Sequence, residues 1–238
     1  MGGTAQLDNW CAVGLSRAHL SHIPGIGLAM AEAGHALARL SSRARASGFE
    51  LAVASGYRDY FRQLAIFNAK ARGERQVTDD AGLILAPDGM SSEQWLHAIL
   101  RFSALPGASR HHWGTDFDVW DQASVSSNYS LRLEPAEYDL GGPFAAFSEW
   151  LTELIEEDDA EGFYRPYATD MGGVAVEAWH LSYRPLASQM ATQVTAEKLL
   201  SLWHCAAVDT PVALTEPLAL VEEITPRVEA LLARYGPA

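Results

Sequence analysis

The chain has 238 residues, of which 48% are apolar and 20% are charged, which is the composition of a folded globular protein rather than of a disordered or fibrous one. Its 17 basic and 30 acidic side chains give a formal net charge of −13. Because this charge repels polyanions, it argues against nucleic acid as a partner. No apolar stretch approaches the roughly 20 residues of a membrane span, so we expect no transmembrane segment.

The first predicted elements are a helix, a strand and a second helix. Apolar residues recur at helical spacing over residues 29–46 and again over 59–71, where Gly73 follows as a C-cap. Residues 49–54 lie between the two helices, and their side chains alternate in the way that predicts a strand. The turn at 55–58 therefore lies at a strand-to-helix junction.

The next segment, 73–90, is rich in Gly, Asp and Pro and predicts a long surface loop. Ser91 is followed three residues later by Gln94, which is a capping box and predicts a helix over 92–103.

A strand is predicted at 115–120, where polar and apolar side chains alternate with period two. This pattern buries Phe117 and Val119 and places Asp116 and Asp118 on the opposite face.

The remaining elements are three helices and one strand. The strand at 179–183 alternates again and carries His180 on its polar face. Amphipathic spacing predicts helices over 143–157, 187–206 and 221–235. Because helices and strands are mixed without regular βαβ alternation, we expect an α+β fold with an antiparallel sheet.

The two cysteines and the N-terminus limit the kind of site and its location. Cys11 and Cys205 are far apart and outside any CxxC spacing, which excludes a disulfide framework and a thiolate zinc finger. A bound zinc would therefore need His and carboxylate ligands. The N-terminus has neither the basic segment nor the apolar run of a signal peptide, so we expect a cytoplasmic protein.

His111, Asp118 and His180 form a candidate zinc site. A catalytic zinc takes three protein ligands and keeps one position open for water, and two His with one carboxylate is a common set. His111 and Asp118 are seven residues apart, a spacing that points them to opposite faces of a straight strand. We therefore expect Gly114 to bend the chain between them.

Glu177 and Arg58 are the candidate reactive groups beside that zinc. A general base held near a metal but not bound to it is usually a carboxylate, and Glu177 lies three residues before His180. Arg58, on its strand-to-helix turn, offers a cation for an oxyanion or for a substrate carboxylate. Each residue taken alone also fits an ordinary surface role, and the combination carries the prediction.

Three motifs in this order resemble a known family. They are Ser55-Gly56-Tyr57-Arg58 with Gln63, then Ser109-x-His111-x-x-Gly114-x-x-x-Asp118, then Glu177-x-Trp179-His180. Together they resemble the D-alanyl-D-alanine carboxypeptidase family of zinc peptidases (VanY-like, peptidase family M15), related in fold to lysostaphin-type peptidases and the hedgehog signalling domain. The resemblance covers about 51–185 and implies a small antiparallel sheet that carries the zinc site, flanked by helices. We therefore describe one domain with an N-terminal helical region (1–50), a zinc-peptidase core (51–185) and a C-terminal helical extension (186–238).

The resemblance also implies the roles of the site residues. One zinc ion per chain is bound by His111, Asp118 and His180, and Glu177 is the general base. Arg58 polarises the scissile carbonyl or binds the terminal carboxylate.

Six further residues have supporting roles in this interpretation. Ser109 is expected to contact the substrate, and Gln63 to support the Arg58 turn. Asp116 departs from the family pattern, where a small or apolar residue is common, so it either competes as a ligand or supports the ligands. His112 is expected to line the pocket or to support the ligands, and Trp113, like Trp179, to pack.

The substrate implied by the resemblance is a peptidoglycan stem peptide. A DD-carboxypeptidase removes D-Ala from D-Ala-D-Ala, whereas an LD-carboxypeptidase removes it from a tetrapeptide in which an L-centred diamino acid precedes it. The expected cytoplasmic location favours an LD-carboxypeptidase of muropeptide recycling, since DD activity there would consume the pentapeptide precursor. A wall endopeptidase and a non-catalytic zinc-stabilised binding module remain alternatives, and an unbound base such as Glu177 argues against the latter.

Overall fold

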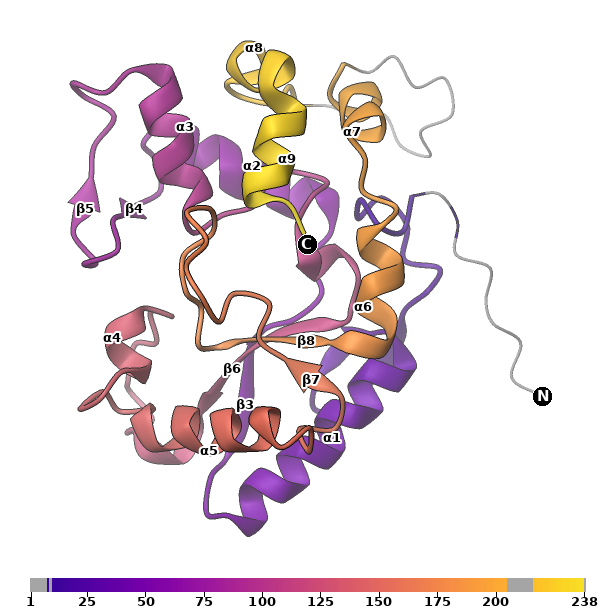
Figure 1. Cartoon of the computed structure of the whole chain (residues 1–238), viewed down its shortest axis with the longest axis vertical. Coiled ribbons are helices and arrows are strands. Elements are labelled where there is room, and N and C mark those ends of the chain that lie inside the picture. The colour runs from indigo at the N-terminus through magenta and orange to yellow at the C-terminus, as the bar shows by residue number, and fades with distance from the viewer. Residues whose placement is uncertain (1–7, 9, 205–215, 238) are drawn as a thin grey trace.

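A computed structural model describes residues 8, 10–204 and 216–237; Cys205 and the end of the predicted helix 187–206 lie outside them. Its main sheet has four strands in the order β3-β6-β8-β7, each antiparallel to its neighbour (Figure 1). The strands are β3 (Leu51–Ser55), β6 (Asp116–Asp121), β7 (Phe163–Tyr164) and β8 (His180–Tyr183). The predicted α+β class with an antiparallel sheet is confirmed.

Helices surround this sheet. The α-helices of the described residues are α1 (Ala31–Ala46), α2 (Tyr60–Ala71), α3 (Ser92–Leu100), α4 (Pro135–Tyr138), α5 (Ala145–Glu156), α6 (Arg184–Ala191), α7 (Ala196–Trp203), α8 (Val221–Ile224) and α9 (Val228–Tyr235). Three 3₁₀ turns accompany them, η1 (Arg110–His112), η2 (Gln122–Ser124) and η3 (Thr225–Arg227). Among the described residues, no helix is long and apolar enough to cross a membrane.

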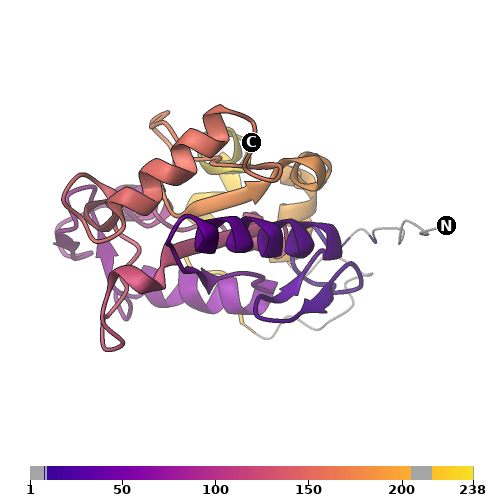
Figure 2. The same ribbon diagram turned by 90° about the horizontal axis from the view of Figure 1, so that it is seen from below.

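The apolar face of the sheet packs against α1 and α5. Phe117 and Leu181 lie in one buried cluster with Leu37 and Leu40 of α1 and Leu151 of α5. In the view from below, α1 and α5 lie on the near side of the strands (Figure 2). This packing follows from the period-two alternation of β6 and β8, which sends the polar side chains to the opposite face.

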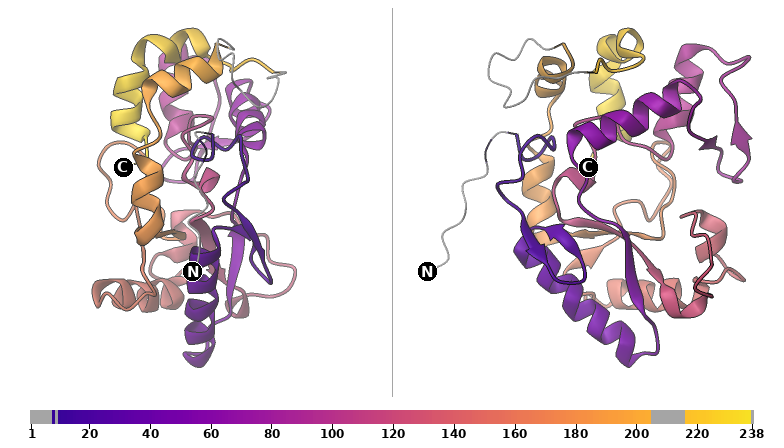
Figure 3. Two further views of the ribbon diagram at one scale, coloured as in Figure 1. Left: turned by 90° about the vertical axis from the view of Figure 1, so that its right-hand side faces the viewer. Right: turned by 180° about the vertical axis from the view of Figure 1, so that it is seen from behind.

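A second apolar cluster joins α2, α3, α7 and α9, which gather at the other end of the molecule in both views of Figure 3. Phe67 of α2, Ile99 of α3, Leu202 of α7 and Leu231 of α9 are all buried in it. The C-terminal residues are therefore part of the same packed core as the helix that follows the Arg58 turn.

Several predicted boundaries hold. Asp59 caps α2 by accepting a hydrogen bond from the Arg62 amide at 2.8 Å. The capping box at α3 is confirmed, because Ser91 and Gln94 exchange hydrogen bonds between side chain and backbone.

Other expectations are corrected. The N-terminal region is not purely helical, since a hairpin of β1 (Ser21–Ile23) and β2 (Gly27–Ala29) precedes α1. The predicted loop 73–90 contains a second small hairpin, β4 (Val77–Thr78) with β5 (Ile84–Leu85). Strands of two or three residues are too short for periodicity to reveal.

The last two predicted helices are each interrupted. The segment 187–206 forms α6 and α7, because the side chain of Thr195 accepts a hydrogen bond from the Lys198 amide and starts a new helix. The segment 221–235 forms α8 and α9 around the 3₁₀ turn η3, where Pro226 has no amide hydrogen to continue the helix.

Candidate metal centre and active site

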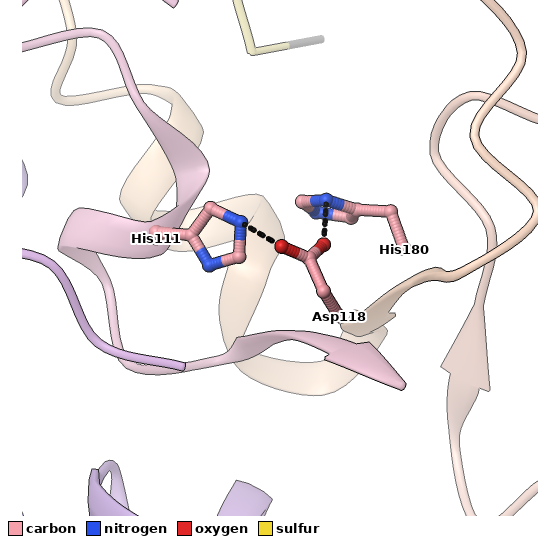
Figure 4. A group of neighbouring side chains, drawn as sticks. All are labelled: His111, Asp118 and His180. Carbon is pink, nitrogen blue, oxygen red and sulfur yellow. Dashed lines mark ion pairs between the residues drawn. The ribbon is translucent and has the colours of Figure 1, made fainter. Parts of the chain in front are cut away.

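Three side chains from separate elements converge at one point on the polar face of the sheet. His111 comes from η1, Asp118 from β6 and His180 from β8, and one ligand atom of each lies within 4.8 Å of the others. All three residues are buried. Figure 4 shows both imidazole rings directed at the carboxylate of Asp118. The structure therefore brings together the three predicted ligands.

Strand register and one glycine produce this convergence. In the antiparallel pair β6–β8, Asp118 lies directly opposite His180, so the two side chains share a face. Gly114 has a positive φ of 71° between η1 and β6, which turns His111 back over the strand as expected. A Cβ atom at Gly114 would lie 2.4 Å from Cδ2 of Leu20. Only glycine fits this bend.

The hydrogen bonds of the two imidazoles decide which nitrogen faces the centre. Nδ1 of His111 lies 3.0 Å from the carbonyl oxygen of Gly56, which can only accept, so Nδ1 carries the proton. Its Nε2 lies 3.3 Å from Oδ2 of Asp118. Nε2 of His180 lies 3.0 Å from Oδ1 of Asp116, and Nδ1 lies 3.1 Å from Oδ1 of Asp118. The free donor atoms are thus Nε2 of His111 and Nδ1 of His180.

These atoms fit a metal ion of the zinc type. Oδ1 of Asp118 is a buried oxygen with no hydrogen bond. Buried polar atoms are nearly always hydrogen-bonded, so an unpaired one is available to bind a metal ion. Burial raises the pKa of Asp118, but His111 and His180 outweigh it and hold the pKa well below its usual value, so the carboxylate is ionised. Two imidazole nitrogens and one carboxylate oxygen are a donor set that zinc accepts with a fourth position left open.

Asp116 supports the ligands and is not a member of the three-residue cluster. Its Oδ1 accepts hydrogen bonds from His180 Nε2 at 3.0 Å and from Arg110 Nε at 2.8 Å, and its Oδ2 accepts one from Thr115 at 2.6 Å. Burial raises the pKa of Asp116, but Arg110 and His180 lower it to about 2. In metal sites, a ligating imidazole commonly donates its other N–H to a carboxylate, which fixes the tautomer of the ring. Arg110 was not predictable from the sequence, since its position beside His111 gives no sign of a buried ion pair.

Glu177 lies beside the ligands on the turn into β8. Its Oε2 is 3.4 Å from Nδ1 of His180, and its side chain is 13% exposed. The amide of His180 donates to the carbonyl oxygen of Glu177 at 3.2 Å, which forms the expected turn. The backbone amide of Glu177 is held by the carbonyl oxygen of Tyr167 at 3.1 Å. The carboxylate is therefore close to the metal centre and in contact with solvent.

The backbone of Arg58 is fixed by the two consecutive histidines. Its amide donates to the carbonyl oxygen of His111 at 3.0 Å, and its carbonyl oxygen accepts from Nδ1 of His112 at 2.6 Å. Nε2 of His112 accepts in turn from the Gly107 amide at 3.2 Å. Burial lowers the pKa of His112 to about 3, so this ring is neutral. His112 thus does not line the pocket but holds the Arg58 turn.

The guanidinium of Arg58 is positioned by Gln63. Arg58 Nη1 donates to Gln63 Oε1 at 2.7 Å, and Gln63 Nε2 donates to the carbonyl oxygen of Ala104 at 2.7 Å. The expected supporting role of Gln63 is confirmed. Burial holds the pKa of Arg58 below its usual value, although the charges of Asp118 and Glu177 act in the opposite direction.

The other candidates divide between packing and an open prediction. Trp113 is fully buried and donates to the carbonyl oxygen of Ala12, and Trp179 packs on Tyr138 with ring centroids 5.4 Å apart. Both tryptophans pack, as expected. Ser109 is buried directly before η1, and its contact with substrate stays a prediction.

Comparisons with known proteins identify one family and several similar proteins. The family VanY, D-alanyl-D-alanine carboxypeptidase, matches residues 28–186. Two uncharacterized proteins of Haemophilus influenzae are also similar. One is 40% identical over 101 residues, which are 42% of this chain and 75% of that protein. The other is 41% identical over 96 residues, which are 39% of this chain and 66% of that protein.

Solved structures with a similar chain path include VanYB and the LdcB LD-carboxypeptidase. VanYB in complex with D-alanine-D-alanine has a TM-score of 0.49 at 20% identity, with 84% of this chain and 92% of that chain covered. The LdcB LD-carboxypeptidase has a TM-score of 0.48 at 22% identity, with 77% of each chain covered.

The family match covers most of the chain and includes every residue of the metal centre. The chain therefore belongs to the D-alanyl-D-alanine carboxypeptidase family. It is a peptidase of this family with a His-Asp-His metal site.

Proposed function

We propose that this protein is a zinc-dependent LD-carboxypeptidase that releases D-Ala from tetrapeptide stem peptides in the cytoplasm. The observation that carries the hydrolytic part is the position of Glu177, with Oε2 3.4 Å from His180 Nδ1 and outside the cluster of His111, Asp118 and His180. A purely structural metal site has no use for a partly exposed carboxylate at this position.

The residues around the metal centre have separate tasks in this reaction. A zinc ion held by His111, Asp118 and His180 would supply an activated water and polarise the scissile carbonyl. Glu177 takes the proton of the attacking water and then donates it to the amine of the leaving D-Ala. Arg58 donates hydrogen bonds to the oxyanion that forms at the scissile carbonyl.

The choice of the LD bond depends on the proposed location rather than on any side chain. In the cytoplasm, the tetrapeptide recovered from wall turnover must be trimmed before reuse. General DD activity in the same compartment would consume the pentapeptide precursor. The DD reaction is the second candidate, because the matching family is described as D-alanyl-D-alanine carboxypeptidase.

Purified zinc-loaded protein incubated with tetrapeptide and pentapeptide side by side tests the proposal. We expect free D-Ala from the tetrapeptide at a kcat/KM well above that for the pentapeptide. Release of D-Ala from the pentapeptide alone would replace the LD function with the DD function. Cleavage of intact sacculi without free D-Ala would instead identify an endopeptidase.

A further inference from the structure

The loop between β7 and β8, residues 165–179, carries Glu177 to the metal centre. All of its residues are described, and none of them belongs to a helix or a strand. A general base must be held in a defined position relative to the water it deprotonates. The position of Glu177 therefore depends on the contacts that this loop makes with the rest of the protein.

Arg101, the C-cap residue of α3, provides several of these contacts. Its Nη1 donates to the carbonyl oxygen of Gly173 at 2.8 Å and to Oδ1 of Asp170 at 3.0 Å, and its Nη2 donates to Oδ2 of Asp170. The carbonyl oxygen of Arg101 accepts a hydrogen bond from the amide of Ala175 at 2.9 Å. The last of these contacts lies two residues before Glu177.

The guanidinium of Arg101 is itself fixed by a second carboxylate. Its Nε and Nη2 donate to the two carboxylate oxygens of Asp80, at 2.7 and 2.6 Å, and so tie the hairpin of β4 and β5 to the same group. Every N–H of the guanidinium therefore has an acceptor. The side chain of Arg101 is only 19% exposed. A buried network of this kind holds its members more rigidly than an isolated surface ion pair.

The C-terminal helix α9 supports the same loop. Nε of Arg234 donates to the carbonyl oxygen of Gly172 at 2.6 Å. Gly173 lies so close to α9 that a Cβ atom there would be 1.8 Å from the carbonyl oxygen of Arg234. The hydroxyl of Tyr235 lies 2.9 Å from Nδ1 of His97 on α3. Figure 1 shows the end of α9 beside the orange loop that leads into β8. The loop is thus held between α3 and a helix that lies beyond the family match.

We propose that Arg101 is a positioning residue for the reaction, which holds the loop so that the carboxylate of Glu177 stays beside His180. The proposal rests on the proposed function, since it requires Glu177 to act as the general base. The hydrogen bonds of Arg101 go to the loop and to Asp80 rather than to a metal ligand, so its loss should leave zinc binding intact. A shift of about 1 Å in a reacting group can lower a rate by about 100-fold.

The test compares Arg101→Met with Arg43→Met, both as zinc-loaded full chains. Arg43 of α1 is the matched control, because its guanidinium also binds two carboxylates, those of Asp159 and Glu161, and the carbonyl oxygen of Asp159. Its side chain is 33% exposed. It lies on the helix that packs against the apolar face of the sheet, opposite the metal centre. Both substitutions therefore remove a guanidinium that joins a helix to a loop.

We expect Arg101→Met to lower kcat roughly 10–100-fold while KM and zinc affinity stay within about twofold of wild type. Arg43→Met should keep all three values. The substrate is whichever stem peptide the wild-type enzyme cleaves, so the result does not depend on LD or DD specificity. Equal kcat values for the two variants, or a loss of zinc affinity in Arg101→Met that accounts for its lower activity, would overturn the proposal.

A double-mutant cycle distinguishes the positioning of Glu177 from damage to the whole site. In the Glu177→Ala background there is no carboxylate to position, so Arg101→Met should change the residual kcat less than about twofold. Loss of the same factor in both backgrounds would exclude the positioning role and leave the proposed function untouched. A fully active Glu177→Ala enzyme would instead overturn the general base and this proposal together.

Two further variants keep Arg101 and test the proposal even if Arg101→Met does not fold. Asp170 and Asp80 bind the same guanidinium and are 45% and 60% exposed, so neither is needed for the core. Asp170 belongs to the loop, and its Oδ1 also accepts from the amide of Gly172 at 2.7 Å. Asp170→Ala should therefore lower kcat severalfold, whereas Asp80→Ala should leave it close to the wild-type value. An unchanged kcat in Asp170→Ala would contradict the proposal.

Discussion

At the scale of single residues, Glu177 and His180 lie one turn apart, yet only His180 belongs to the metal cluster. This separation divides metal binding from proton transfer. We expect Glu177→Ala to retain zinc and to lose roughly 10²–10⁴-fold in kcat, the range for loss of a general base. His180→Ala, in contrast, should lose the metal itself. Metal analysis and steady-state kinetics on both variants check this, and an active Glu177→Ala enzyme would contradict the assigned role.

Asp116 allows a second test at this scale, because it touches the metal centre only through His180. Asp116→Asn keeps the shape but removes the charge that orients the imidazole, so zinc affinity should fall roughly 10–100-fold. Asp121→Asn is the matched control, since Asp121 is equally buried on β6 but accepts hydrogen bonds from the amides of Glu50 and Ala123 instead. Competition with a chromophoric chelator measures both affinities. Unchanged affinity in Asp116→Asn would remove its positioning role.

At the scale of elements, the bend at Gly114 joins η1 to β6 and thereby sets the distance between His111 and Asp118. At Gly114, an alanine would have a positive φ of 71° and its Cβ would lie 2.4 Å from Cδ2 of Leu20. At Gly89, an alanine would have a φ of 85°, but its Cβ would lie in open space. Gly89→Ala should therefore cost only the backbone strain of about 1–2 kcal/mol.

Gly114→Ala should cost more than Gly89→Ala in the free energy of unfolding, and it should also weaken zinc binding. Urea unfolding and metal titration of the two variants measure these effects. Equal losses of stability with intact metal affinity would show that the bend does not control the ligand geometry.

At the scale of the whole molecule, the metal centre links segments that are distant in sequence, η1, β6 and β8. Zinc that binds only the folded protein stabilises it by about 2.7 kcal/mol when present at 100 times its dissociation constant. Calorimetry should therefore show a lower melting temperature after chelation and recovery on adding zinc. His180→Ala should melt at the same temperature with and without the metal. If chelation leaves the wild-type melting temperature unchanged, this coupling is contradicted.

Lys70 makes the global stability depend on pH in a definite direction. Its pKa is about 8 in the folded protein and 10.5 ordinarily, so between these values the unfolded chain binds more protons. This group then adds stability as pH rises through that window, and its cost is complete below pH 8. The shift corresponds to at most about 3 kcal/mol, reduced by the water that a half-buried group retains.

The direction of this pH dependence gives a prediction for a Lys70 variant. Lys70→Met should raise the free energy of unfolding relative to wild type at pH 7, and the difference should shrink towards pH 10.5. Urea unfolding at pH 7 and pH 10 measures the two differences. A difference that is constant with pH would show that Lys70 is not desolvated in the folded protein.

Much of the site was predictable because its residues lie in short motifs. His111, Asp118, His180 and Glu177 follow from the types of side chain that hold a metal and move a proton, and Gly114 from the odd spacing of two ligands. The period of β6 and β8 likewise indicated which face is apolar.

Other features depend on contacts between distant segments. The ion pair of Asp116 with Arg110 decides that Asp116 supports His180 rather than binding metal, and both residues are charged side chains that a sequence places at the surface. The short hairpins and the breaks at Thr195 and Pro226 were missed for a different reason. There, local capping and a missing amide interrupt a helical pattern whose apolar period continues across the break.

The sequence by itself determined the kind of chemistry, since donor atoms and their order along the chain are fixed by residue type. Only the tertiary structure decided how those atoms are used: which imidazole nitrogen faces the centre, and which of two aspartates supports the other ligands. These features depend on hydrogen bonds between residues distant in sequence, such as His180 and Asp116, and they form only when the strands of the sheet pair.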